Sequence, residues 1–270
     1  MSDAMRVFDR PLVRRRRDRA AALFPEFDFL VREAANRLVD RMDDVIRRFP
    51  SVLDLGCHTG QVAEELRAKD AFEHLVQCDL SPRMARLAAV NGCASVVADE
   101  EWLPFKDASF DLVISCLSLH WVNDLPGTLV QIRRVLKPEG LFLGVMLGGE
   151  TLKPLRDSLA AAELEIDGGI SPRVSPFADV RDMGQLLQRA GFTLPVADGD
   201  RIVVRYADPM RLLSDLRGMG ETNAVLSRRK VPLKRQTLLT AMAKLFEDHR
   251  DADGRVPVPF ELIGLTGWAS

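Results

Sequence analysis

The segment Val52–Gly60, with the sequence VLDLGCHTG, decides the fold of this chain. Its first four residues predict a short buried strand, and the five residues from Gly56 predict a turn with a glycine at each end. A helix is predicted to follow over Gln61–Ala68. A second predicted strand, Leu75–Asp79, ends in an acid nineteen positions after Gly60. Strand, glycine turn and helix form the ligand-binding corner of an α/β fold, and an acid at that distance suits ribose hydroxyls.

Residues around the turn favour a ligand other than a dinucleotide. A pyrophosphate-binding turn would have glycines at positions 56, 58 and 61, whereas this chain has Gly56, His58 and Gln61. Asp54 precedes the turn, where its carboxylate would repel phosphates and attract a cationic amine. S-adenosylmethionine carries an ammonium and a sulfonium and lacks phosphate, so the motif favours a site for this cofactor. The alternative is a structural turn in some other α/β protein.

The overall composition is that of an ordinary globular protein and excludes several partner classes. Of the 270 residues, 47% are hydrophobic and 28% are charged, and the net charge is −2. That charge gives no general attraction to nucleic acid or to an anionic membrane. No apolar run approaches the length that spans a bilayer. We therefore predict no nucleic-acid partner and no stable membrane insertion.

The cysteines and the N-terminal acids bear on the cellular compartment. The four cysteines form no C-x-x-C pair and predict buried free thiols in a reducing compartment: Cys57, Cys78, Cys93 and Cys116. The arginine-rich start is similar to a mitochondrial presequence, but such presequences avoid acids, and this segment contains Asp3, Asp9 and Asp18. We therefore expect a cytoplasmic protein.

Two helices are predicted ahead of the first strand. Residues 6–19 contain seven arginines against two aspartates, a local excess of five positive charges. We interpret this run as the solvated face of a helix, with a basic lid or a docking arm for an acidic partner as the alternative. Residues 28–49 have apolar side chains at helical spacing and predict a second helix, which Pro50 ends.

Short apolar strands alternate with helices after the glycine turn, which predicts a parallel sheet. Ligands bind such sheets at the carboxyl ends of the strands. The first four strand ends carry Asp54 with Gly56, then Asp79, Asp99 and the segment Ser115–His120, so polar groups gather along one edge. Further strands are predicted at 95–98, 110–115 and 141–147, a turn at 137–140, helices at 81–90, 124–136, 152–164, 180–190, 209–216 and around 238–245, β-rich runs at 192–196 and 202–206, and a last strand within 256–268.

Five motifs resemble those of the class I S-adenosylmethionine-dependent methyltransferases: Asp54–Gly60, Asp79, Asp99–Phe105, Phe110–Val113 and Leu136–Gly140. Two families of that class share more of the pattern. They are the methyltransferase-like assembly factors of respiratory complex I, a family of protein-arginine hydroxylases, and, more distantly, the malonyl-acyl-carrier methyltransferases of biotin synthesis. The resemblance to the assembly factors runs nearly end to end and includes the strings at 8–10, 117–126, 148–149, 175–177 and 218–221.

This resemblance implies the architecture of the whole chain. The expected fold is α/β and doubly wound, a mostly parallel seven-stranded Rossmann-like methyltransferase sheet with N-terminal helices and a helical cap insertion. The expected division is an N-terminal helical lid at 1–50, an S-adenosylmethionine-binding core at 51–150, and cap helices with the C-terminal completion of the sheet at 151–270.

The resemblance also implies S-adenosyl-L-methionine as the cofactor and gives roles to individual residues. Gly56 and Gly60 would hold its methionine end, Asp79 its ribose, and Asp99 and Glu100 its adenine. The complete set of predicted cofactor-binding residues is Asp54, Gly56, Cys57, Gly60, Asp79, Leu80, Asp99, Glu100 and Ser115. One residue departs from the family pattern, because His58 stands where a glycine is usual. A side chain there would cost about 1–2 kcal/mol if the position needs a positive φ, so we expect cofactor binding that is weakened but retained.

The implied function is that of a methyltransferase-like enzyme that acts on a protein substrate, a complex I subunit, during assembly. Hydroxylation of an arginine on an iron–sulfur subunit, a non-catalytic assembly role, and methylation of a small acid or an acyl carrier are the alternatives. His120 and Glu150, at the ends of the fourth and fifth strands, are the candidate catalytic bases. An aromatic wall beside Trp121 and a solvated helix cap are their alternative roles. The four histidines show no H-x-D spacing, so no metal site is predicted.

Overall fold

The computed structural model describes residues 6–270, so the first five residues of the predicted lid, Asp3 among them, lie outside the described part of the chain. Its strands are β1 (Ser51–Leu55), β2 (His74–Asp79), β3 (Ala94–Val97), β4 (Phe110–Cys116), β5 (Leu136–Leu147), β6 (Phe192–Tyr206) and β7 (Val256–Ala269). They form one seven-stranded sheet in the order β3-β2-β1-β4-β5-β7-β6. The first five strands are parallel, and β7 runs antiparallel to both of its neighbours.

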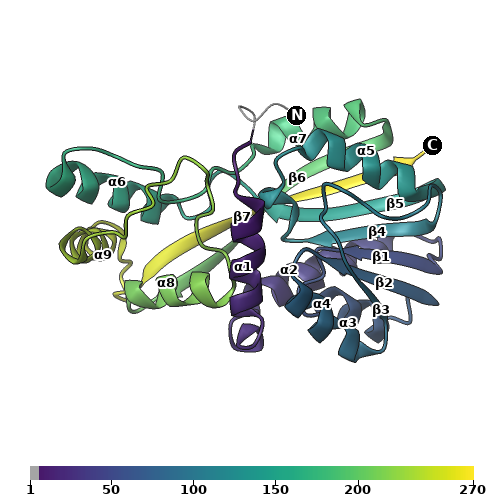
Figure 1. Cartoon of the computed structure of the whole chain (residues 1–270), viewed down its shortest axis with the longest axis horizontal. Coiled ribbons are helices and arrows are strands. Elements are labelled where there is room, and N and C mark those ends of the chain that lie inside the picture. Colours follow the sequence, from purple (N-terminus) through teal and green to yellow (C-terminus); the bar gives the residue numbers. More distant parts are fainter. Residues whose placement is uncertain (1–5) are drawn as a thin grey trace.

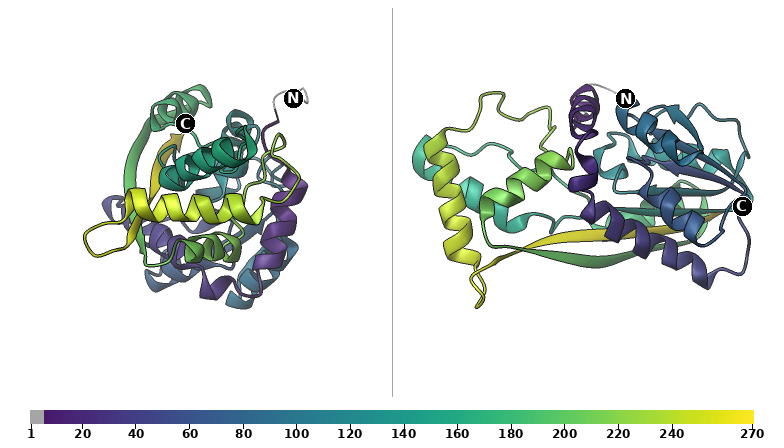
Figure 2. Two further views of the ribbon diagram at one scale, coloured as in Figure 1. Left: turned by 90° about the vertical axis from the view of Figure 1, so that its left-hand side faces the viewer. Right: turned by 90° about the horizontal axis from the view of Figure 1, so that it is seen from below.

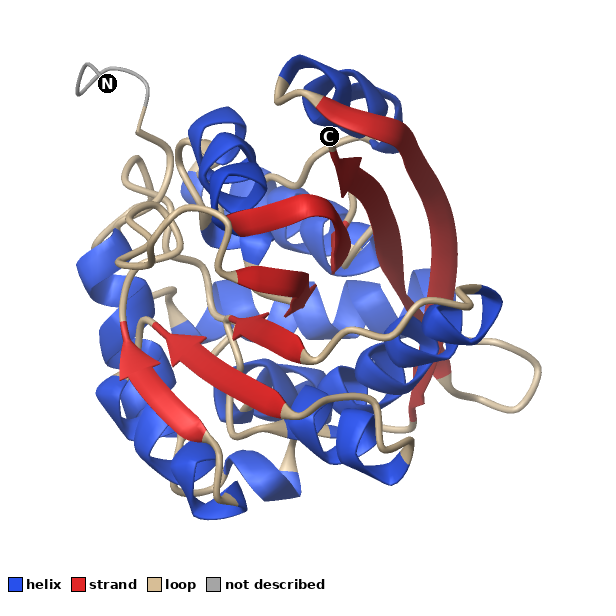
Figure 3. Ribbon diagram, turned by 90° about the vertical axis from the view of Figure 1, so that its right-hand side faces the viewer, coloured by secondary structure: helices blue, strands red, loops and turns tan. Residues whose placement is uncertain are grey.

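Helices cover both faces of this sheet (Figure 3). The α-helices of the described residues are α1 (Arg10–Ala20), α2 (Phe29–Asp40), α3 (Gln61–Ala68), α4 (Pro82–Ala88), α5 (Leu125–Val135), α6 (Lys153–Asp167), α7 (Val180–Arg189), α8 (Pro209–Gly218) and α9 (Arg235–His249). Successive residues of a strand point to opposite faces. Accordingly, Leu112 and Ile114 of β4 pack in one hydrophobic cluster with α2 and α3, while Val113 packs in another with α5 and α7. The predicted doubly wound fold is confirmed.

The helices that follow the strands begin where the sequence predicts them. Ser81 caps α4 by accepting a hydrogen bond from the backbone N–H of Met84 at 3.2 Å, and Pro82 occupies the first turn. Asp124 caps α5 in the same way through the N–H of Gly127 at 2.9 Å. The caps fix where each helix starts, directly after a strand end that contributes to the site.

The predicted turn at 137–140 lies inside β5 as a bulge. Leu136 pairs with Phe110 and Leu141 pairs with Leu112, so the four residues 137–140 of β5 lie opposite the single residue Asp111 of β4. Glu139 takes a positive φ of 59° within this bulge. The strand predicted at 141–147 therefore begins earlier, at Leu136, and includes the residues that were predicted to form the turn.

One strand was predicted as two, and one helix was predicted too long. The β-rich runs at 192–196 and 202–206 join into β6, because β7 pairs with it along both runs and through the polar residues between them. Asp198 and Asp200 in that middle part pair with arginines of the N-terminal region at 2.6 Å, which makes polar residues tolerable in a strand. Helix α2 ends at Asp40 and tightens into a 3-10 turn at Arg41–Asp44, well before Pro50.

The cap stands beside the sheet at the far end of β6 and β7 (Figure 2). Helix α6 packs against α9, and α9 packs against α8. Helix α1 lies between this cap and the helices that follow the first strands (Figure 1). Its position places the arginine-rich segment at the centre of the molecule.

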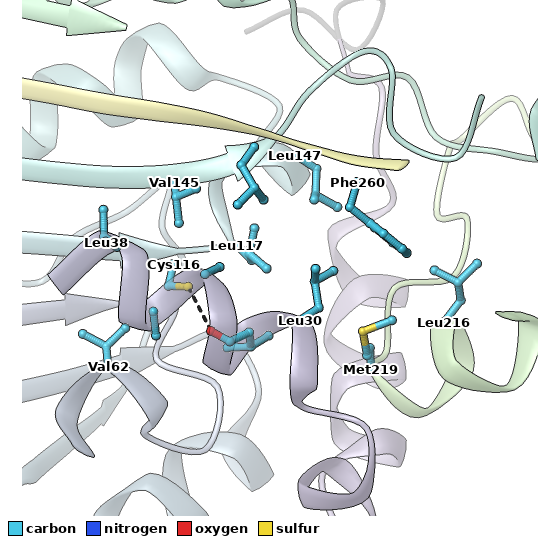
Figure 4. Close-up of a cluster of buried hydrophobic side chains, with 14 of the residues drawn as sticks. Leu30, Leu38, Val62, Cys116, Leu117, Val145, Leu147, Leu216, Met219 and Phe260 are labelled. Atoms are coloured by element: carbon cyan, nitrogen blue, oxygen red, sulfur yellow. Dashed lines mark hydrogen bonds between the residues drawn. The ribbon is translucent and has the colours of Figure 1, made fainter. Parts of the chain in front are cut away.

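A continuous hydrophobic core joins the sheet to the cap. Leu38 of α2, Val145 of β5 and Phe260 of β7 belong to the same buried cluster, and it extends to Leu216 of α8 (Figure 4). The thiol of Cys116 points at the carbonyl oxygen of Val31 on α2, with 3.7 Å between the sulfur and the oxygen. Because this core draws on all three predicted segments, it marks no break at residue 50 or 150, and the domain boundaries stay a prediction.

Candidate active site

The glycine turn leaves β1 through three residues with positive φ. Gly56, His58 and Gly60 have φ values of 74°, 48° and 102°. The N–H groups of Gly56 and Cys57 donate to the carbonyl oxygen of Cys78 at 2.7 and 3.0 Å, which ties the turn to the end of β2. His58 therefore adopts the left-handed conformation that the family pattern assigns to glycine.

His58 is part of the structure of this turn. Its backbone N–H donates to Asp79 Oδ2 at 3.1 Å, and its ring stacks on Phe24 with 5.5 Å between the centroids. The ring Nε2 lies 3.0 Å from the carbonyl oxygen of Cys116. Because a carbonyl oxygen only accepts, Nε2 must carry the proton. Burial, reinforced by the positive charge of Arg17, lowers the pKa of His58 to about 4, so the ring is neutral at pH 7.

We expect His58 to make the protein less stable as the pH falls from about 6.5 to about 4. The native state resists protonation of this ring and the unfolded state does not, so acid favours unfolding across that window. His58→Gln removes the titration, and the difference in free energy of unfolding between wild type and variant should change by about 3 kcal/mol between the two pH values. Urea unfolding at each pH measures it. His74→Gln, at an exposed position, is the control, and a difference that does not vary with pH would contradict the assignment.

Asp54 and Asp79 lie fully buried at the ends of β1 and β2. Burial and, to a smaller extent, the neighbouring charge of Asp79 together raise the pKa of Asp54 to about 8. Neither carboxylate oxygen of Asp54 has a hydrogen-bond partner at normal geometry within residues 6–270. Burial also raises the pKa of Asp79, to about 6, although the charge of Arg17 opposes that shift. Both aspartates therefore have a higher pKa than a solvated carboxylate. The increase is smaller for Asp79, because the charge of Arg17 opposes it.

Two arginines of α1 form ion pairs with acids at the strand ends, namely Asp79, Asp99 and Glu100. The prediction of a solvated helix face is wrong for these two arginines. Arg17 is completely buried, with Nη1 3.6 Å from Asp79 Oδ2 and 3.4 Å from Glu100 Oε1. Arg10 pairs with Asp99 at 2.5 Å and with Glu100. Seven residues make about two helical turns, so these arginines share one face of α1. The buried acids supply the countercharge that allows that face to lie inward.

Glu100 is the acid that these arginines stabilise most. Burial would raise its pKa, but the charges of Arg10 and Arg17 and a hydrogen bond from Ser118 outweigh burial and lower it to about 2. Glu100 is completely buried. The ionised carboxylate therefore stands between two buried guanidinium groups, and the three side chains act as one charged cluster.

The residues expected to cradle S-adenosylmethionine lie together at the ends of the strands, but side chains of this chain occupy the space beside Gly56, Asp79 and Glu100. A Cβ placed on Gly56 would lie 2.2 Å from Ser118 Oγ, so the loop after β4 sits directly on the glycine. Arg17 occupies the space beside Asp79 and Glu100, the acids assigned to the ribose and the adenine. All three side chains are fully buried. In this structure, Ser118 and Arg17 therefore close the predicted cofactor corner.

The remaining predicted cofactor residues lie around this corner. Gly60 begins α3. Cys57 is buried, and burial raises the pKa of its thiol far above the ordinary value. Leu80 packs with Val13 of α1. Ser115 donates its hydroxyl proton to the carbonyl oxygen of Leu55 at 2.7 Å, so its side chain joins β4 to β1.

His120 and Glu150, the two predicted bases, are not brought together. His120 is buried in a short 3-10 helix, Leu119–Trp121, and its Nε2 lies 2.9 Å from Glu221 Oε2. Trp121 Nε1 donates to the same oxygen at 2.8 Å. Glu150 is exposed and pairs with Lys153 at 3.1 Å. Of the two predicted bases, only His120 is therefore buried, and it is paired with Glu221.

Glu221 is the residue that sequence reasoning missed. Although burial would raise its pKa, the charge and hydrogen bond of His120 and the charge of Arg17 lower it, so Glu221 is ionised. It lines a cavity of about 260 Å³ whose walls are mainly apolar, among them Leu159, Phe177 and Met219. A carboxylate beside an apolar cavity is the usual design of a site that orients a ligand.

Comparisons with known proteins identify the family. A methyltransferase-domain model matches residues 53–144. The mitochondrial arginine hydroxylase NDUFAF5 of Danio rerio is 45% identical over 268 residues, which cover 98% of this chain and 83% of that protein. This chain belongs to the NDUFAF5 arginine-hydroxylase family. The Homo sapiens member is also 45% identical, over 98% of this chain and 77% of its own length. The resemblance predicted from the motifs is thereby confirmed.

The more distant resemblance is confirmed as well. A malonyl-[acyl-carrier protein] O-methyltransferase of Halorhodospira halophila is 37% identical over 96% of this NDUFAF5-family chain and 88% of its own. Among solved structures, the YcgJ protein of Bacillus subtilis gives a TM-score of 0.58 at 16% identity, over 86% of this chain and 97% of that one. A Haloferax volcanii protein solved with the Trm112 methyltransferase activator gives 0.58 at 19% identity, over 95% and 97%. The methyltransferase domain supports S-adenosylmethionine as the cofactor.

No group of three or more His, Cys, Asp or Glu side chains within residues 6–270 is placed to hold a metal ion. No helix in the described chain is long and apolar enough to cross a membrane.

Proposed function

We propose that this NDUFAF5-family protein is an S-adenosylmethionine-binding enzyme that modifies an arginine side chain of a respiratory complex I subunit during assembly. The observation that carries the proposal is 45% identity, over 98% of this chain, with relatives named arginine hydroxylases. Addition of an oxygen atom is the modification that those names favour; it would consume molecular oxygen and a two-electron reductant supplied from outside this chain, with water as the second product. Methyl transfer is the modification that the methyltransferase domain favours.

The cavity beside Glu221 supports an arginine as the acceptor. Glu221 pairs only with His120 among residues 6–270, so its negative charge has no guanidinium or ammonium within ion-pair distance. Of the two arginines that line the cavity, Arg173 is paired with Glu163 at 2.7 Å and Arg217 is exposed. A substrate guanidinium would find in Glu221 a carboxylate that accepts paired hydrogen bonds.

The hydrogen bond to Glu221 also prepares His120 to act as a base. An ionised carboxylate only accepts, so Nε2 of His120 carries the proton in this pair. When the ring is neutral, Nδ1 is therefore its basic nitrogen, and Nδ1 is buried with no hydrogen-bond partner in the described chain. In methyl transfer, a guanidinium nitrogen becomes a nucleophile for the sulfonium methyl group only after it loses a proton. We propose that Nδ1 of His120 takes that proton, with Glu221 holding both the ring and the substrate.

A deletion strain tests the proposed function directly. We expect a complex I subunit from wild-type cells to contain an arginine that is heavier by one oxygen atom and to lose this mass in the deletion strain. Wild-type protein should restore the modification, and Glu221→Gln should not, while Glu150→Gln should restore it because that side chain lies at the surface. Mass spectrometry of peptides from purified complex I gives the readout.

The other candidate functions predict different results in the same experiment. A mass gain of one methylene group on the subunit would show methyl transfer. Restored assembly by Asp79→Ala without any modified subunit would show a scaffold that needs no catalysis. A methylated acyl carrier with unmodified complex I would place the activity with the malonyl-carrier relatives. Each of the last two outcomes would contradict the proposal.

We also propose a cytoplasmic location, on the basis of the acids in the N-terminal segment and of four free cysteines in the described chain. The NDUFAF5 relatives themselves are named as mitochondrial proteins. The exposed face of α1 carries three arginines that have no ion-pair partner among residues 6–270: Arg14, Arg15 and Arg19. Their positive charges would suit an acidic surface of the protein substrate.

A further inference from the structure

The arginine side chain of Arg17 takes the place that the proposed cofactor needs. Its guanidinium contacts Asp79 and Glu100 at 3.6 and 3.4 Å, and both nitrogens Nη1 and Nη2 lie 3.3 Å from Ser118 Oγ. Ser118 in turn covers Gly56. The guanidinium of Arg17 therefore contacts the residues assigned to the ribose and the adenine. It also contacts Ser118, which covers the glycine assigned to the methionine end.

Helix α1 is also attached to the cap on its other side. Phe8 forms a β-bridge with Val225, and the N–H of Asp9 donates to the carbonyl oxygen of Ala224 at 2.9 Å. Arg16 donates to the carbonyl oxygens of Thr222 and Asn223. These contacts bind α1 to the segment that directly follows Glu221. The helix thus connects the acids of the cofactor corner to the cavity of the proposed acceptor.

We propose that α1 is an autoinhibitory strap, in which Arg17 occupies the cofactor corner and must leave before S-adenosylmethionine can enter. The inference rests on the proposed cofactor. Exchange of the two keeps the net charge of the corner constant, because S-adenosylmethionine, with an ammonium, a sulfonium and a carboxylate, carries the same single positive charge as the guanidinium. The acids of the corner would then face the neutral ribose and adenine in place of Arg17.

Competition of this kind has a defined effect on affinity. If only the fraction of molecules with Arg17 withdrawn can bind, the apparent dissociation constant equals the intrinsic one divided by that fraction. Removing the arginine raises the fraction towards one. A lid would behave in the opposite way, because an arginine that closes over bound cofactor contributes to affinity and its loss weakens binding.

Titration calorimetry with S-adenosylmethionine separates the two roles. We expect Arg17→Met to lower the dissociation constant at least tenfold, whereas Arg14→Met, on the exposed face of the same helix, should leave it unchanged. Equal or weaker binding by Arg17→Met would overturn the strap. Absence of binding by both proteins would instead remove the cofactor itself and, with it, the strap.

Hydrogen exchange on the wild-type protein tests the strap without any substitution. Cofactor at ten times its dissociation constant should speed amide exchange at residues 13–20, because binding withdraws Arg17 and loosens α1. The amides of α9, which lies in the cap away from the corner, serve as the internal control. Slower exchange in α1, or exchange that does not change, would overturn the proposal even if Arg17→Met failed to fold.

Discussion

Replacing Glu100 by glutamine should lower the free energy of unfolding at pH 7 by about 3–5 kcal/mol, the usual cost of removing one partner from a buried ion pair. Arg10 and Arg17 both direct their guanidinium groups at this carboxylate, and both are buried. A neutral amide would leave Arg17 with Asp79 alone and would withdraw the closest countercharge of Arg10. Urea unfolding of both proteins measures the loss.

The pH dependence of that loss identifies its cause. The pKa of Glu100 is lowered from 4.5 to about 2 in the native state, so the native state resists its protonation. The stabilisation is therefore complete above about pH 4.5 and disappears as the pH falls towards 2. The difference between wild type and Glu100→Gln should shrink over this window. Glu150→Gln, which disturbs an exposed pair with Lys153, should cost less than about 1 kcal/mol at every pH. A Glu100→Gln loss of the same small size would contradict the buried cluster.

Replacing Asp54 by asparagine should have the opposite effect and stabilise the protein at pH 8. Burial and the charge of Asp79 raise the pKa of Asp54 from 3.8 to about 8. The native state therefore favours the neutral acid, and ionisation costs stability as the pH rises through the window from about 4 to about 8. Asparagine has nearly the same shape and never ionises. The gain should be on the order of a few kcal/mol at pH 8 and close to zero at pH 4.

Thermal or urea unfolding at several pH values tests this prediction. The wild-type curve should fall relative to the Asp54→Asn curve as the pH rises from 4 to 8. Asp40→Asn is a suitable control, because Asp40 is half exposed and pairs with Lys69 at the surface. Parallel curves for wild type and Asp54→Asn would show that the pKa of Asp54 is the same in the native and unfolded states, which would contradict the prediction.

Much of the fold follows from local signals that are strong in this chain. The glycine turn, the capped starts of α4 and α5, and the alternation of apolar strands with helices each depend on neighbouring residues, and the structure places those elements where the sequence predicts them. The continuous β6 was harder to predict, because Asp198 and Asp200 resemble a turn. They are accommodated by Arg37 and Arg41 of a distant segment.

The candidate site was less predictable for a related reason. Asp79, Asp99 and Glu100 stand at strand ends, where parallel-sheet geometry brings polar residues together. Arg10 and Arg17 reach them from sequence positions at least 60 residues away, and an arginine-rich helix gives no local sign of which face turns inward. The spacing of Arg10, Val13, Arg17 and Ala20 on one face was the available signal. Glu221 likewise depends on the tertiary approach of the cap to His120.

A crystal structure of the protein with bound S-adenosylmethionine would test the central claim most directly, namely that this corner is the cofactor site and that α1 holds it shut. We predict the cofactor in the corner, with its ribose at Asp79 and its adenine towards Asp99, and the Arg17 guanidinium withdrawn from Asp79 and Glu100. A cofactor bound elsewhere, or bound beside an Arg17 that still contacts both acids, would contradict the account.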